Sequence, residues 1–200
     1  MRLTVDVRDM LVASWPVGTE DVARVLPPGL EPAEMNGGHR VSAVFLCYAH
    51  GRLGRLPAPP FAGLNIRVYT SWKGEQAACF LDARVTPPGK LAALFVPVRT
   101  ARLRVRRGRA EGLGLSLRYE VDGPADPGDL DRLELGLFPA AGLKALRVHR
   151  GPAEWRRAEL LEPARVDPIL ALGFEVHEPV ELLYVAETRL EADLPPRRVR

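Results

Sequence analysis

The sequence predicts a mostly β domain of the α+β class that spans residues 1–200. Segments of alternating apolar and polar residues, joined by turns rich in glycine and proline, predict strands, and the helical signals are few and short. Hydrophobic residues make up 46% of the 200 positions, which is enough for one substantial core. No run of about 18 apolar residues occurs, so no membrane-spanning helix is expected.

The first strand is expected at residues 1–8, where apolar and charged or polar residues alternate. This pattern differs from the apolar run of a secretory signal, so we expect a cytoplasmic protein. A helix is predicted near Thr19, which can cap it, and Glu20 and Asp21 suit its first turn. Pro27-Pro28-Gly29 should end this helix.

Asn36-Gly37-Gly38 predicts a turn between two strands. Residues 41–48 are apolar at nearly every position and are expected to form a central strand. The Gly/Pro-rich loop at 51–60 is long enough to cover or rim a site.

The clearest local signal is a hairpin across Lys73-Gly74, a pair suited to a two-residue turn. Its register makes one face apolar, pairing Leu64, Ile66, Val68 and Thr70 with Ala83, Leu81, Cys79 and Ala77. The other face carries Asn65, Arg67 and Tyr69, with Asn65 directly opposite Asp82 and Arg67 diagonal to it.

Two interpretations of this polar face remain open. It can be a solvated outer face with an Arg67–Asp82 ion pair worth less than about 1 kcal/mol. It can instead line a cavity, where Asp82 orients Arg67 and the free guanidinium donors bind a carboxylate or phosphate. Periodicity alone does not separate the inside of a wet barrel from the outside.

Residues 98–107 are predicted to form another alternating strand, with 113–121 returning beside it after a turn at Gly108. Arg99 shares the parity of the apolar positions 101, 103 and 105, so its cation should point inward. An inward arginine needs a partner, either a structural acid or an anionic ligand.

Six arginines within eleven residues could also neutralise nucleic-acid phosphates: Arg99, Arg102, Arg104, Arg106, Arg107 and Arg109. No aromatic residue interrupts the run, and acids elsewhere bring the net charge to only +3. A basic outer strand that resists edge pairing is the simpler interpretation.

The C-terminal half predicts short elements only. A helix is expected to start at 126–130 and another at 167–172. Strands are expected at 145–148, 155–161 and 180–190.

The remaining composition argues against metal and cofactor sites. Cys47 and Cys79 lie in apolar runs and are expected to be reduced core residues, and the four histidines are far apart. We expect no metal and no cofactor. Arginine is preferred over lysine, asparagine and glutamine are scarce, and prolines are frequent. High-GC coding could produce this bias, and so could selection for heat resistance, so a thermophilic origin is one of two open hypotheses.

The order of several motifs resembles the YqjF-like family of uncharacterised bacterial proteins, within the acetoacetate decarboxylase-like superfamily. The motifs are Val25-Leu26-Pro27-Pro28-Gly29-Leu30, Phe61 with Asn65-Ile66-Arg67-Val68-Tyr69, Phe80-Leu81-Asp82-Ala83, Val96-Pro97 with Ala101-Arg102-Leu103, and Pro195-Pro196-Arg197-Arg198-Val199. The resemblance implies an antiparallel, closed, cone-like barrel with a cavity inside and a few short flanking helices.

The resemblance also identifies what this chain lacks. The superfamily's best-known enzyme forms a Schiff base through a lysine that follows a proline and precedes a second lysine. The corresponding positions here are Val98 and Arg99, and valine cannot form an imine. The family's expected glutamate corresponds to Gly63. True acetoacetate decarboxylation is therefore not expected.

The sequence favours a barrel that binds a small anionic or oxo-bearing metabolite, with or without catalysis, and with no Schiff-base lysine. The candidate ligand-binding residues are Asn65, Arg67, Tyr69, Asp82 and Arg99. A non-catalytic structural or interaction protein with a filled barrel is the alternative, and nucleic-acid binding is the third. Neither the ligand nor the oligomeric state follows from the sequence.

Overall fold

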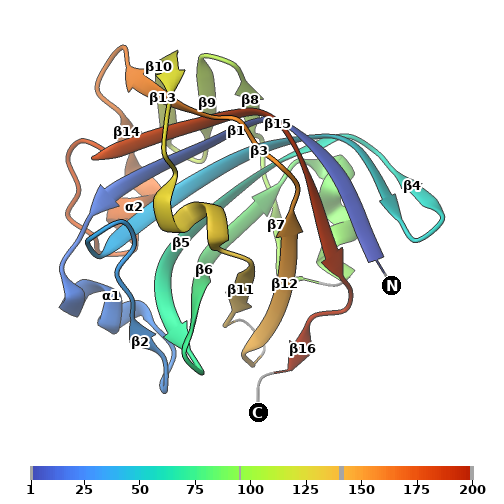
Figure 1. The fold of residues 1–200 in the computed structure, drawn as a ribbon, viewed down its shortest axis with the longest axis horizontal. Helices are drawn as coiled ribbons and strands as arrows, with labels where there is room; N and C mark the ends of the chain where they lie inside the picture. Colours follow the sequence, from blue (N-terminus) through green and yellow to red (C-terminus); the bar gives the residue numbers. More distant parts are fainter. Residues whose placement is uncertain (1, 95, 140–141, 199–200) are drawn as a thin grey trace.

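The computed structural model describes residues 2–94, 96–139 and 142–198 (Figure 1). The long strands are β1 (Arg2–Pro16), β3 (Arg40–Leu53), β5 (Phe61–Trp72), β6 (Glu75–Val85), β10 (Leu115–Pro124) and β15 (Glu181–Asp193). The shorter strands are β2 (Glu31–Pro32), β4 (Leu56–Ala58), β7 (Arg99–Thr100), β8 (Arg104–Arg106), β9 (Arg109–Gly112), β11 (Leu135–Phe138), β12 (Lys144–Arg150), β13 (Trp155–Leu160), β14 (Arg165–Val166) and β16 (Arg197–Arg198). The helices are α1 (Thr19–Val25), α2 (Asp167–Ala171) and the 3₁₀ segments η1 (Pro87–Leu94) and η2 (Gly128–Arg132).

Seven of these strands close into a barrel. Around the ring they follow the order β1, β3, β5, β6, β11, β12 and β15, and β15 pairs again with β1. All of these pairings are antiparallel except β6 with β11. The predicted mostly β fold and the closed barrel implied by the resemblance are confirmed. The closure depends on the β12–β15 pairing, which joins segments about 40 residues apart in sequence.

The two faces of the barrel wall pack differently. On the outer face, Leu11, Phe45 and Ile66 belong to a core covered by α1, α2 and the sheet formed by β8, β9 and β10. On the inner face, Val12 and Val44 pack with Met35, Leu130 and Trp155, which come from the loop before β3, from η2 and from β13. Alternation along each strand therefore supplies two apolar surfaces, one for each core.

The first strand is almost twice as long as predicted. It continues to Pro16 because its register with β3 shifts between Arg8 and Leu11, which restores the alternation after two irregular residues. Asp9 lies within this shift, at a φ of 51°. The apolar–polar pattern of the sequence breaks at the same place, which hides the continuation of the strand.

Two local predictions, a helix cap and a hairpin turn, need correction. Gly18, not Thr19, is the N-cap of α1, and no side chain caps this helix. The Asn36-Gly37-Gly38 turn exists, but it does not join a hairpin, since β2 pairs with β5 and not with β3. Asn36 instead uses its side chain to hold other segments in place.

The 73–74 hairpin has the predicted turn and a partly different register. Lys73 and Gly74 both have positive φ, and the pairs from Trp72–Glu75 to Arg67–Phe80 are those expected. A β-bulge between Ile66 and Arg67 then shifts the register by one residue, so that Asn65 lies opposite Ala83. The predicted pairing of Asn65 with Asp82 is therefore wrong.

The prediction of one continuous strand over residues 98–107 is also wrong. Residues 101–103 have no regular structure, and only β7 and β8 are extended. Gly108 does mark a turn, but β8 pairs with β9, and β10 follows as the next strand. The alternation of apolar and polar positions that predicted an inward Arg99 is thus interrupted.

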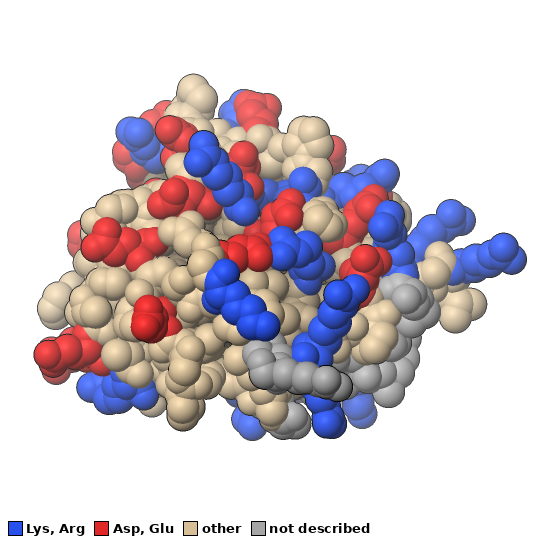
Figure 2. Space-filling model, turned by 60° about the horizontal axis from the view of Figure 1, so that its bottom comes forward, with Lys and Arg blue, Asp and Glu red and all other residues tan. Residues whose placement is uncertain are grey.

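The surface mixes both signs of charge. Figure 2 shows basic and acidic side chains interspersed over one face of the molecule. Within the arginine-rich segment, Arg104 and Arg109 both pair with Glu111, at 3.4 Å and 2.6 Å. Among the described residues, no helix has the length and apolar character needed to cross a membrane.

Candidate functional site

The barrel holds an interior cavity of about 240 Å³. All seven barrel strands contribute to its wall, together with residues of the segments before β7 and before β11. Most of the lining is apolar, and the aromatic rings of Phe80 and Phe138 stack in it with their centroids 4.5 Å apart. The charged or amide side chains among the lining residues are Asn65, Arg67, Arg84, Glu134 and Arg150.

Asn65 and Arg67 both lie in this wall, as the cavity interpretation of the hairpin face requires. They reach the cavity from β5 because strand alternation points residues 63, 65 and 67 to the inner face. The Asn65 amide oxygen is buried and has no hydrogen-bond partner among the described residues. A bound molecule with a hydroxyl or N–H group could supply the missing donor.

Arg67 is a cation without an acidic partner among the described residues. Its Nε donates to the Tyr69 hydroxyl at 3.3 Å, and its guanidinium carbon lies 5.4 Å from the Tyr69 ring centroid. No other hydrogen bond holds the two terminal nitrogens of Arg67 within the described part of the chain. These nitrogens are free to bind an anion in the cavity.

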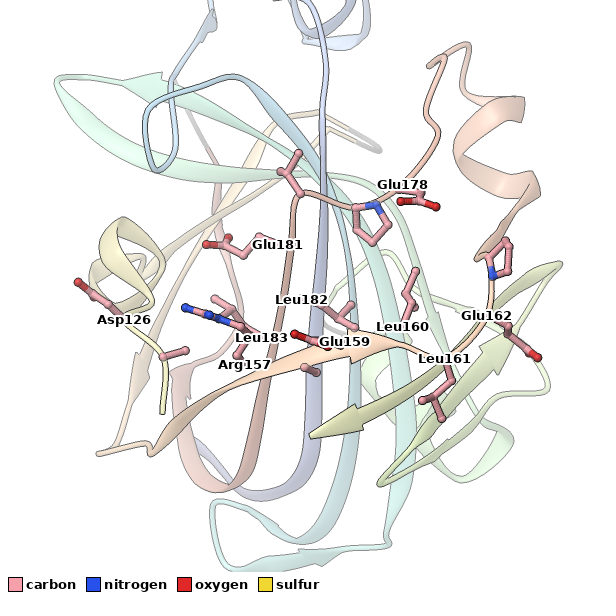
Figure 3. Close-up of a pocket in the computed structure, with 15 residues that line it drawn as sticks. Asp126, Arg157, Glu159, Leu160, Leu161, Glu162, Glu178, Glu181, Leu182 and Leu183 are labelled. Atoms are coloured by element: carbon pink, nitrogen blue, oxygen red, sulfur yellow. The ribbon is translucent and has the colours of Figure 1, made fainter. Parts of the chain in front are cut away.

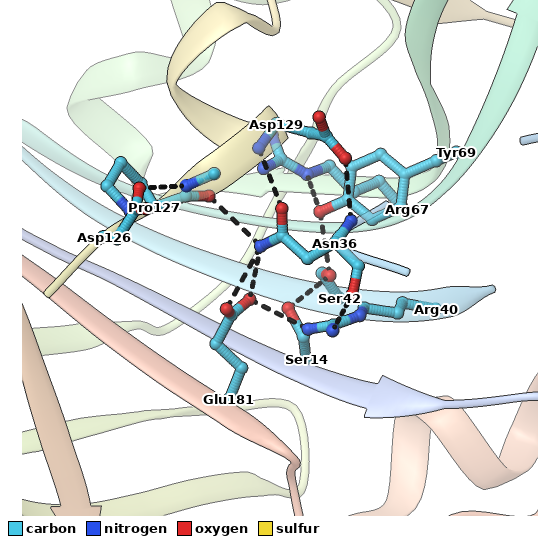
Figure 4. A network of polar contacts seen from close by, with 11 residues as sticks. Ser14, Asn36, Arg40, Ser42, Arg67, Tyr69, Asp126, Pro127, Asp129 and Glu181 are labelled. Atoms are coloured by element: carbon cyan, nitrogen blue, oxygen red, sulfur yellow. Dashed lines mark hydrogen bonds and ion pairs between the residues drawn. The ribbon is translucent and has the colours of Figure 1, made fainter. Parts of the chain in front are cut away.

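Tyr69 positions Arg67 through a chain of buried hydroxyls (Figure 4). The Tyr69 hydroxyl donates to Ser42 Oγ at 2.9 Å, and Ser42 Oγ lies 2.8 Å from Ser14 Oγ. All three residues are almost completely buried, and they come from the adjacent strands β5, β3 and β1. Tyr69 therefore supports the site from behind and does not line the cavity.

Asp82 and Arg99 do not join this group. The bulge in the hairpin places Asp82 opposite Ile66 and away from Arg67; its carboxylate accepts a hydrogen bond at 2.9 Å from the Nε of Arg84, which does line the cavity. Arg99 is exposed, because β7 is only two residues long and pairs in parallel with the end of β6. The prediction that Asp82 contacts Arg67 is wrong, and so is the prediction that Arg99 points inward.

The two positions that the motif resemblance matches to the enzyme's lysine and glutamate face the cavity. Val98 and Gly63 both line it. A Cβ atom on Gly63 would come within 3.0 Å of the Tyr48 ring, so this ring already occupies the space next to Gly63. Burial raises the pKa of the Tyr48 phenol to about 12. At these two positions the wall therefore has apolar and aromatic groups.

The comparisons with known proteins agree with this architecture. A family model described as an uncharacterized conserved protein, DUF2071, matches residues 4–188. The chain belongs to the DUF2071 family. No curated protein matches it.

Solved structures show the same fold at low sequence identity. The enduracididine biosynthesis enzyme MppR complexed with pyruvate has a TM-score of 0.66 and 15% identity, with 99% of this chain and 90% of that chain covered. Acetoacetate decarboxylase from Legionella pneumophila has a TM-score of 0.70 and 13% identity, with coverages of 100% and 88%. An acetoacetate decarboxylase-like enzyme from Sphingomonas wittichii has a TM-score of 0.69 and 14% identity, with coverages of 99% and 93%. This DUF2071 chain therefore has the acetoacetate decarboxylase-like fold.

The structure adds Arg150, a cavity residue that the sequence reasoning missed. Its Nη2 donates to the carbonyls of Leu130 and Asp131, at 2.8 Å and 2.6 Å, and its guanidinium carbon lies 4.8 Å from the centroid of the Trp155 ring. The strand was expected to end at residue 148. Extending the alternation of Leu146 and Val148 by one step would have pointed residue 150 inward.

Asn36 was also missed, because the sequence marks it only as a turn residue. Its backbone N–H donates to Asp129 Oδ2, and its side-chain oxygen accepts from the Asp129 N–H, at 2.9 Å and 2.8 Å. Its Nδ2 donates to Glu181 Oε1 at 3.1 Å, and Glu181 also pairs with Arg40 at 3.0 Å (Figure 4). These bonds fasten η2 and the loop before β3 to β15, next to the Met35 and Leu130 side chains of the inner core.

A second hollow lies outside the barrel, between β13 and the start of β15 (Figure 3). Figure 3 shows Glu159, Glu162 and Glu178 around it, together with the cation Arg157. None of the residues predicted from the sequence as ligand contacts lies there. The interior cavity is therefore the candidate site.

Proposed function

We propose that this DUF2071 barrel binds a small organic anion, a carboxylate or an oxo-bearing acid, without forming a covalent bond to it. The observation that carries the proposal is Arg67, a cation in the cavity wall without an acidic partner among the described residues. Removing a charge from water without a partner is costly, and a ligand carboxylate would supply the partner through two parallel hydrogen bonds.

The size and chemistry of the cavity limit the ligand. A volume of about 240 Å³ lies below the range of roughly 300–1,000 Å³ that is typical for drug-sized ligands, which favours a small metabolite. The likeness to MppR complexed with pyruvate supports a small carboxylate, since that fold accommodates one in the related structure.

The same cavity argues against Schiff-base chemistry. The chain has three lysines, Lys73, Lys90 and Lys144, and none of them is among the described residues that line the cavity. Val98 stands where the resembling enzyme has its lysine. An oxo acid bound here would therefore be held without a covalent bond. Any reaction would use the polar side chains that line the cavity, such as Asn65 and Arg67.

A thermal-shift panel of small carboxylates and 2- and 3-oxo acids tests the binding. A ligand at 100 times its Kd stabilises a protein by about 2.7 kcal/mol, which is a rise of about 5–10 °C for a chain of this length. We expect at least one acid to raise Tm in the wild type and not in Arg67→Met. Arg118→Met, an exposed arginine on β10 paired with Glu162, is the matched control and should keep the response.

Absence of a response to the whole panel would contradict the proposal and favour a structural role for the barrel. An equal response in Arg67→Met would contradict the assignment of the anchor. Borohydride treatment in the presence of the responding oxo acid tests the chemistry. The protein mass should stay unchanged, whereas a reduced imine adduct would overturn the noncovalent mode.

A further inference from the structure

Arg150 approaches the cavity from the opposite part of the ring to Arg67. It lies on β12, which is separated from β5 by β6 and β11, and its alternation with Val148 points it inward. All of its hydrogen bonds to described residues use one nitrogen, Nη2. Its Nε and Nη1 have no partner in the described part of the chain.

Arg67 and Arg150 line the same cavity of about 240 Å³, so their guanidinium groups can act on one ligand. Burial lowers the pKa of Arg150; Asp131 opposes this effect, and the positive charge of Arg67 lowers the pKa further. Two cations that repel across a largely apolar cavity form a favourable place for one negative group between them.

The charges around the cavity leave one positive charge without a counterpart. Arg84 pairs with Asp82 at 2.9 Å, and Arg150 pairs with Asp131 at 3.2 Å. Glu134, the one acid among the described lining residues, lies 3.1 Å from His149 and 3.7 Å from Arg147. Only Arg67 remains, so a single negative charge on the ligand completes the balance.

The rest of the cavity is suited to an apolar body. The stacked pair of Phe80 and Phe138 lies in the wall with Leu146 and Val98. The volume of about 240 Å³ equals roughly eight molecules of liquid water, and so holds a body of about that many non-hydrogen atoms. A short aliphatic or aromatic acid meets both conditions.

We propose that Arg150 is a second ligand anchor and that the cavity takes an amphiphilic monocarboxylate. Its carboxylate lies between Arg67 and Arg150, and its apolar chain of about five carbons lies among Phe80, Phe138 and Leu146. This proposal rests on the proposed function and specifies the ligand class. It predicts that an apolar tail strengthens binding and that a second charge weakens it.

Titration calorimetry with hexanoate tests the ligand class on the wild-type protein. We expect hexanoate to bind at least tenfold more tightly than acetate, which lacks the tail. Adipate, which adds a second carboxylate at the far end, and hexanamide, which lacks the charge, should bind at least tenfold more weakly than hexanoate. Tighter binding of adipate or acetate would overturn the inference while leaving the proposed function intact. No binding of any acid, here and in the thermal-shift panel, would overturn both.

The anchor is tested with variants. Arg150→Met should weaken hexanoate binding at least tenfold, and Arg189→Met, an exposed arginine of β15 paired with Asp6, should leave it unchanged. Asp131→Asn loosens the same contacts to η2 but keeps the Arg150 cation, so hexanoate should bind equally or more tightly. Equal losses in Arg150→Met and Asp131→Asn would show a packing effect and overturn the anchor.

A crystal structure with hexanoate provides a measurement that does not depend on any variant folding. The carboxylate should lie within hydrogen-bond distance of both guanidinium groups. A carboxylate that contacts Arg67 alone, or a tail that points away from Phe80 and Phe138, would overturn the proposal.

Discussion

Replacement of Asn65 by leucine should stabilise the unliganded protein. The Asn65 amide oxygen is buried in the cavity wall and lacks a partner among the described residues, a condition that costs about 1–3 kcal/mol. Leucine has a similar size and no polar atom. Removing this unfavourable free energy of about 1–3 kcal/mol should raise Tm by about 2–12 °C, since each kcal/mol corresponds to roughly 2–4 °C in a chain of this length.

The contrasting case is the same substitution at Asn36, whose positive φ of 49° adds backbone strain to the loss of hydrogen bonds. There the side chain bonds to Asp129, Pro127 and Glu181, so Asn36→Leu leaves those groups without partners. It should lower stability by at least 1–3 kcal/mol. Urea or thermal unfolding by circular dichroism measures both variants. A Tm for Asn65→Leu at or below that of the wild type would refute the reasoning, because the amide oxygen would then have a partner in solution, such as an ordered water.

Three further predictions follow from individual contacts. Arg40→Met removes the largely buried partner of Glu181 and should cost about 1.5–3 kcal/mol in urea unfolding; an unchanged midpoint would contradict a stabilising role for the pair. Gly63→Ala brings a methyl group to 3.0 Å from the Tyr48 ring and should destabilise by about 1 kcal/mol, whereas an increase in Tm would show that the ring moves freely. Because burial raises the Tyr48 pKa from 10.0 to about 12, stability present below pH 10 should fall as the pH rises toward 12, and Tyr48→Phe should flatten this part of the profile.

The sequence by itself determined the features that depend on neighbouring residues. The Lys73-Gly74 turn requires two positive φ angles, and this local requirement is met in the structure. Alternation in the 61–72 strand separated an apolar face from one that carries Asn65 and Arg67, and these two residues do line the cavity. The motif resemblance added the barrel, and the fold bears it out.

The tertiary structure decided the features that depend on curvature and on ring closure. One bulge between Ile66 and Arg67 turns Asp82 away from Arg67, because an extra residue in a strand changes the face of every residue beyond it. The irregular segment at 101–103 interrupts the alternation that predicted an inward Arg99, and Arg99 is exposed. Arg150 comes to the cavity only because β12 pairs with β15 to close the barrel, a contact between distant segments that no local pattern contains.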